Sequence, residues 1–143
     1  MKATILILTL SFLISNSLNA QKSLSFTNET CEKIGIPYSE GNMLQLTCEF
    51  EFENKSASVI SLTQENYIKE CSCSTIADVT NVRPGQRGKI IYTYTLDPSN
   101  ENEYESKIKE LQENQGLIEK EFGVRINDDE FYQLYFTGSV TFN

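Results

Sequence analysis

Four cysteines are the residues of this chain whose chemistry is easiest to recognise. They are Cys31, Cys48, Cys71 and Cys73, and four cysteines allow three disulfide connectivities. Cys71 and Cys73 can close a small, strained and easily reduced ring, hold a soft ion such as Cu(I) as thiolates, or pair with Cys31 or Cys48. A thiol oxidoreductase would instead show C-x-x-C at a helix start in a βαβ unit, and the sequence has no such motif.

The other residue types exclude most catalytic and metal sites. The 143 residues include no histidine, which removes Ser-His-Asp and Cys-His nucleophiles and every histidine-ligated metal centre. The net charge of −8 would repel a phosphate backbone, so we expect no nucleic-acid partner. The stretch Asn127–Glu130 lacks the spaced ligands and glycine of a calcium loop and is interpreted as a turn. We expect neither an enzyme nor a cofactor.

The first twenty residues have the order of a secretory signal. Met1-Lys2 is a basic start, Ala3–Ile14 is an apolar run, and a polar stretch ends at the small residue Ala20. We expect cleavage before Gln21, which leaves 21–143 as one domain. The apolar run is shorter than the roughly twenty residues that a membrane span needs. We therefore expect a periplasmic or secreted protein with no membrane insertion after signal cleavage.

Alternating apolar residues predict that the rest is mainly β-structure. The clearest strand covers 44–52, where apolar side chains share one face and polar ones share the other, as in an antiparallel sheet with one wet face. Other strands are predicted near 24–26 or 31–36 and over 59–62, 89–96, 122–126 and 134–142, with a turn at Arg83–Gly88. About seven short strands at this spacing are typical of a sandwich.

Residues 98–115 interrupt the strand pattern and are predicted to form an inserted helix. The segment is polar and rich in helix formers, and Gly116 can end the helix. Tyr104, Ile108 and Leu111 form a narrow apolar stripe at helical spacing. We expect the helix to lie against the sandwich by this stripe as a surface decoration that does not build the core. The alternative is a helix that binds a partner.

Five short stretches, in the right order, resemble a bacterial exported family known as domain of unknown function 1573. They are Phe50–Asn54 (F-x-F-x-N), Cys71–Ser74 (C-G-C-T in the family), Arg83–Gly85 (its P-G turn), Gly116–Asp128, and Leu134–Val140 (its closing L-x-i-x-G-x-V). The family is similar to the immunoglobulin-like domains of PapD chaperones, major sperm protein and ciliary ASH proteins. The resemblance implies an immunoglobulin-like antiparallel sandwich used for protein contacts, with no established enzymatic role. The chain departs from the family at Ser72, which replaces a glycine, and in the 98–115 insertion.

The resemblance also bears on the cysteines. In the family the C-x-C pair generally has no dedicated partners, which leaves Cys31 and Cys48 as an extra couple. A bridge between them would contribute about 3 kcal/mol; alternatively, Cys48 packs in the core as a small hydrophobe. We expect a binding or assembly module for an unidentified protein, through a sheet edge that accepts a strand. The alternative function is thiol redox chemistry or copper binding at Cys71 and Cys73.

Overall fold

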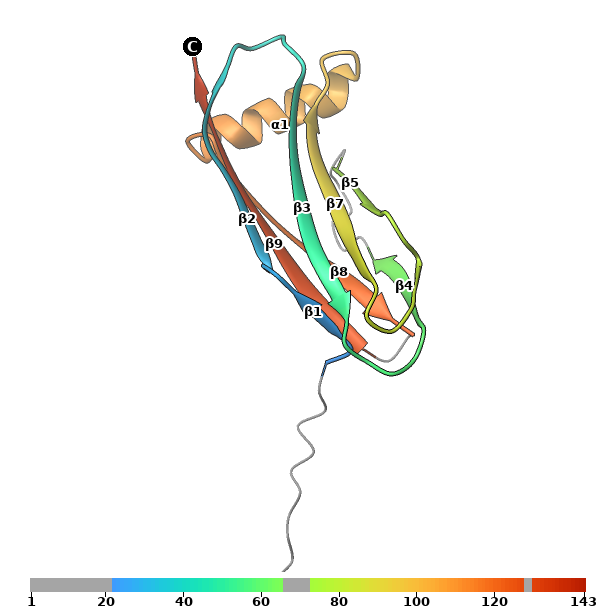
Figure 1. Ribbon diagram of the computed structural model, residues 1–143. Coiled ribbons are helices and arrows are strands. Elements are labelled where there is room, and N and C mark those ends of the chain that lie inside the picture. Colours follow the sequence, from blue (N-terminus) through green and yellow to red (C-terminus); the bar gives the residue numbers. More distant parts are fainter. Residues whose placement is uncertain (1–21, 66–72, 128–129) are drawn as a thin grey trace, which may run out of the picture.

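The computed structural model describes residues 22–65, 73–127 and 130–143, which form two facing sheets and one helix (Figure 1). The strands are β1 Leu24–Phe26, β2 Thr30–Tyr38, β3 Leu44–Asn54, β4 Ile60–Glu65, β5 Cys73–Ala77, β6 Asn81–Val82, β7 Arg87–Leu96, β8 Leu117–Ile126 and β9 Glu130–Phe142, and the helix α1 is Glu101–Glu113. The predicted signal sequence lies outside the described residues.

The strand order is that of an immunoglobulin-like sandwich. Sheet one has the order β1-β3-β7-β5, and sheet two has the order β2-β9-β8-β4-β6. These orders match the two sheets of the immunoglobulin fold, except that the first strand is divided between the sheets as β1 and β2 and that the short strand β6 is added beside β4. The predicted all-β sandwich with an inserted helix is therefore confirmed.

The N-terminal segment differs from the prediction in two ways. The two stretches predicted as alternatives both form strands. Strand β1 pairs with β3 in sheet one, and the chain then crosses to sheet two, where it continues as β2. The expectation of a fully antiparallel sandwich is wrong at β2, which runs parallel to β9, whereas the other described pairs are antiparallel. This division and the short strands β5 and β6 raise the number of described strands above the seven expected.

The core lies between the sheets, on the faces that the alternation predicted. Even-numbered residues of β3 and β7 point inward, and so do those of β8 from Ile118 onward. Aromatic side chains join the two layers: the Tyr92 ring of β7 stacks on the Phe122 ring of β8, with centroids 5.0 Å apart. Such offset contacts add to the burial of apolar surface that stabilises the sandwich.

Helix α1 connects β7 to β8 and crosses one end of the sandwich (Figure 1). The predicted stripe does face the sheets, but Ile108 and Leu111 are only 5% and 2% exposed and belong to the core. Lys107 beside them is also buried; its ammonium donates to the Thr95 carbonyl (2.7 Å) and lies 3.2 Å from the Glu103 carboxylate. The expectation of a surface decoration is therefore wrong, because the helix closes the end of the core.

The asparagine of the F-x-F-x-N stretch has a structural role. Asn54 is 1% exposed, and its amide donates to the carbonyls of Ser58 and Val82 at 2.8 and 3.0 Å. Its side-chain oxygen accepts the Ser56 N–H, and its carbonyl accepts the N–H of Gly85 in the P-G turn. Two of the stretches that resemble the family thus hold one another at the end of the sandwich opposite α1.

Candidate interaction surfaces

Cys31 and Cys48 form a disulfide that links the two sheets. Cys31 lies on β2 and Cys48 on β3, and their Cα atoms are 6.1 Å apart. Facing sheets normally stand about 10 Å apart, so the bridge holds the sandwich narrow along this side. Cys48 is fully buried and Cys31 is half-buried. The disulfide is therefore a structural link between the two sheets, and Cys48 is shielded from solvent.

The second cysteine pair remains a prediction. Cys71 lies outside the described residues, and only the backbone of Cys73, the first residue of β5, is described. Asp128 and Asp129 of the predicted acidic turn lie outside the described residues as well. Within the described ranges, no three cysteine or carboxylate side chains gather as a metal site. The thiol or copper hypothesis therefore gains no support here.

Three of the four described edge strands, β1, β2 and β6, have features that hinder the addition of another strand. Strand β1 has three residues and β6 has two. Strand β2 is longer, but its register shifts between Lys33 and Ile36, where Gly35 takes a positive φ of 69°, and Pro37 follows. Short strands, bulges and prolines are the devices by which natural sheets protect their edges. Strands β1, β2 and β6 are therefore poor templates for the strand addition expected from the sequence, whereas β5, the other edge of sheet one, has five residues in unbroken register with β7.

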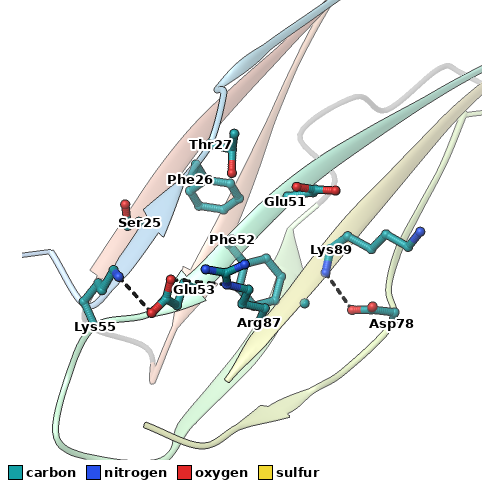
Figure 2. A pocket seen from close by; sticks show the side chains of 11 residues that line it. Ser25, Phe26, Thr27, Glu51, Phe52, Glu53, Lys55, Asp78, Arg87 and Lys89 are labelled. Carbon is teal, nitrogen blue, oxygen red and sulfur yellow. Dashed lines mark hydrogen bonds and ion pairs between the residues drawn. The ribbon is translucent and has the colours of Figure 1, made fainter. Parts of the chain in front are cut away.

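A groove of about 520 Å³ lies on sheet one, and its charged side chains bind one another (Figure 2). The Glu53 carboxylate is 2.8 Å from the Lys55 ammonium and 3.5 Å from Nε of Arg87. The hydrogen bond from Lys55 is the main cause of the lowered pKa of Glu53. Asp78 accepts the backbone N–H of Lys89 at 2.7 Å. The groove is therefore a polar surface in which Glu53 and the two cations beside it, Lys55 and Arg87, neutralise one another.

The outer face of sheet two has a different composition. The exposed large hydrophobic residues of the described chain are Ile34, Met43, Val59, Leu117, Phe131 and Tyr135. Three of them, Leu117 of β8 and Phe131 and Tyr135 of β9, lie on this face and are each at least 40% exposed. Phe131 and Tyr135 are four residues apart on one strand, which places them about 13 Å apart.

Two hollows bordered by carboxylates lie beside Leu117 and Tyr135. A hollow of about 350 Å³ between β8 and β9 is lined by Glu119, Glu121 and Tyr135 and also by Lys120, whose ammonium is 3.3 Å from the Glu110 carboxylate. A second hollow, of about 240 Å³, is lined by Leu117, Glu119 and Glu110 of α1. Glu119 borders both. Together with Phe131, these residues form the β8–β9 face, which consists of Leu117, Glu119, Glu121, Phe131 and Tyr135.

The carboxylates of the β8–β9 face differ from those of the groove on sheet one. No ion pair within 4.0 Å joins Glu119 or Glu121 to a cation among the described residues. Across the strand pair, Glu121 stands opposite Tyr135 and Glu119 opposite Thr137. The face thus combines exposed rings, two hollows and carboxylates available for another molecule.

Sequence reasoning missed this face, although a signal was present. The alternation in the last strand assigns Leu134 and Phe136 to the core, so odd-numbered residues must point to solvent. An outward position is usually polar, yet Phe131 and Tyr135 are aromatic. Phe131 also precedes the predicted strand, which began at 134, whereas β9 begins at Glu130.

Comparisons with known proteins support the fold but name no family. No family model matches the chain, and no curated protein matches it, so membership of domain of unknown function 1573 stays a prediction. A protein of unknown function from Porphyromonas gingivalis W83 has a TM-score of 0.51 at 12% identity over 81% of the chain, which spans 46% of that protein. The Vibrio cholerae VesB protease has a TM-score of 0.57 at 8% identity over 85% of the chain, which spans 33% of the protease.

A third similarity involves a domain of about the same size. The ASH/PapD-like domain 7 of human CEP192 aligns over 100% of the chain and 98% of its own length, at 8% identity and a TM-score of 0.49, a level from which we conclude nothing further. At the identities of the first two neighbours, the likeness concerns the fold alone. The chain is an immunoglobulin-like β-sandwich.

Proposed function

We propose that this protein is a non-catalytic binding or assembly module that contacts a protein partner through the β8–β9 face. The observation that carries the proposal is that Leu117, Phe131 and Tyr135 are all exposed on one side of the sandwich, spread along the β8–β9 pair. On the opposite side, β3 and β7 expose no large hydrophobic residue. Exposed apolar side chains framed by polar ones are typical of interaction sites.

The residue types and dimensions of the face suit a protein interface. Aromatic side chains are enriched where protein interfaces derive most of their binding energy. Strand β8 has ten residues, and over that length the β8–β9 pair together with the flanking strands β2 and β4 covers about 600 Å² of sheet. This area approaches the roughly 800 Å² that each partner buries in a standard complex.

The place of action that we propose is outside the cytoplasm, periplasmic or secreted. The signal-like N-terminal sequence supports export, and the disulfide between Cys31 and Cys48 fits an oxidising compartment. In the described part of the chain, no helix has the length and apolar character of a membrane span. The lack of histidine supports a non-catalytic role.

The test compares two double variants with the unmodified protein as bait. Phe131→Ser with Tyr135→Ser removes both rings of the β8–β9 face. Thr47→Ala with Thr93→Ala is the control, since these two hydroxyls face one another on the outer side of sheet one, 3.3 Å apart. The bait is incubated with the extracytoplasmic fraction of the producing cells, and a captured protein is quantified by mass spectrometry.

We expect the ring variant to lose the captured protein at least tenfold, because two aromatic anchors together contribute more than about 1.4 kcal/mol. The threonine variant should recover as much as the unmodified protein. Circular dichroism should show that both variants are folded. Equal recovery by all three baits would refute the proposal.

A further inference from the structure

We infer that the partner presents lysine or arginine side chains to the β8–β9 face, so that the face binds a basic protein surface. This inference rests on the proposed function and adds the chemical class of the partner. It follows from the charges around Tyr135 and from the residues that line the hollow beside it.

Carboxylates lie beside the part of the face around Leu117 and Tyr135, whereas Phe131 stands opposite Arg125. Glu119 lies between the two hollows, and Glu121 borders the larger one beside Tyr135. Glu110 of α1 lines the smaller hollow, where its carboxylate is 3.3 Å from the Lys120 ammonium. A partner that covers Tyr135 therefore brings its own groups close to Glu119 and Glu121, and positive groups there are favoured.

The larger hollow has the chemistry to receive one basic side chain. The Tyr135 ring is 40% exposed, and the aliphatic stem of lysine or arginine packs well on such a ring. From that position the charged end of the side chain reaches the carboxylates across the strand pair, where charge-assisted hydrogen bonds form. The ring and the carboxylates favour the same class of side chain.

A second copy of this chain is a poor occupant. In a symmetric dimer the same face meets itself, so Glu119 and Glu121 of the two copies would approach each other. The chain carries a net charge of −8, which adds long-range repulsion. Like charges brought together at an interface oppose binding.

The outer face of sheet one offers a matched control. Glu49 and Glu51 stand two residues apart on β3, as Glu119 and Glu121 do on β8, but Glu49 is 3.0 Å from the Lys89 ammonium. Glu119→Gln with Glu121→Gln and Glu49→Gln with Glu51→Gln change the net charge of the protein equally. A difference in binding between these two variants therefore depends on where the carboxylates lie and not on the net charge.

The experiment uses two synthetic peptides that share the same aromatic and aliphatic residues, one carrying lysines and the other glutamates. Binding to the purified protein is followed by fluorescence anisotropy, and NMR locates the affected residues. We expect the lysine peptide to bind and to shift the signals of Tyr135, Glu119 and Glu121. Glu119→Gln with Glu121→Gln should weaken its binding about tenfold, and the control should change it less than twofold. Equal binding of both peptides, or equal weakening by both variants, would overturn the inference.

The same variants separate this inference from the proposed function. If Phe131→Ser with Tyr135→Ser abolishes capture from the extracytoplasmic fraction and the Glu119/Glu121 variant does not weaken it, the docking face stands and the basic partner is refuted. If neither variant affects capture, the proposed function itself fails. A dimer in sedimentation that disappears in the ring variant would identify a second copy as the occupant and overturn the inference.

Discussion

The disulfide between β2 and β3 allows a quantitative prediction for Cys31→Ala with Cys48→Ala. The two residues are 17 apart in sequence, and the entropy of closing a loop of that length in the unfolded chain corresponds to about 3 kcal/mol. In the folded state, pairing with β9 holds Cys31 and pairing with β7 holds Cys48. The variant should therefore keep its fold and lose about 3 kcal/mol of unfolding free energy, with Tm lower by about 10 °C.

Urea unfolding followed by circular dichroism measures this difference. Reduced wild-type protein is the control, because opening the same bridge should bring its stability close to that of the variant. A loss below about 1 kcal/mol would refute the reasoning, since it would mean that the closed loop adds little constraint to the unfolded chain. Peptide mapping without reductant tests the pairing itself. A fragment linking Cys48 to Cys71 or Cys73 would contradict it.

Three further predictions concern stability and use the same urea assay. Leu111→Ala should cost about 2–5 kcal/mol, because this helix residue is only 2% exposed; a loss under 1 kcal/mol would show that α1 is a decoration. Gly116→Ala should cost about 2 kcal/mol or more, since φ is 81° and a Cβ would stand 2.2 Å from the Val140 carbonyl oxygen; unchanged stability would contradict this contact. The pKa values of four tyrosines are raised above 10.0, and burial is the largest cause in each case; they are Tyr38, Tyr92, Tyr94 and Tyr132. Above pH 10.0 the unfolded chain releases these protons and the folded protein keeps them, so stability should fall as pH rises; constant stability from about pH 8 to 11 would contradict the shifts.

The sequence predicted the central strands well because their two faces differ sharply. In β3 and β7 every second residue is apolar, and a shift of one residue would expose the whole apolar set. No comparable alternation in the sequence predicted that the first strand would be divided between the two sheets. Residues 24–26 and 31–36 each read as a strand, and only the positions of β3 and β9 in space decide that both form.

The helix and the candidate site show where sequence patterns are insufficient. The stripe of Tyr104, Ile108 and Leu111 predicted which side of α1 faces inward, but the depth of burial depends on the open end of the sandwich beneath it. No sequence pattern predicted that the Lys107 ammonium would be buried. Its hydrogen-bond partner is the backbone carbonyl of Thr95, and every residue has such a carbonyl. Phe131 lay outside the predicted strand, which began at 134, so the alternation that marks it as an outward aromatic residue was not extended to it.

The parallel pairing of β2 with β9 has a consequence for the order of folding. Thr30 pairs with Tyr135 and Tyr38 with Phe142, so the second strand finds its neighbour in sheet two only when the last described strand is present. Contacts between such distant parts of a chain slow folding, because a long loop must close before any of them forms. A chain still emerging from the ribosome has no β9 and cannot complete sheet two. Sheet two therefore stays incomplete until synthesis has passed residue 142, and β2 has no partner in that sheet before then.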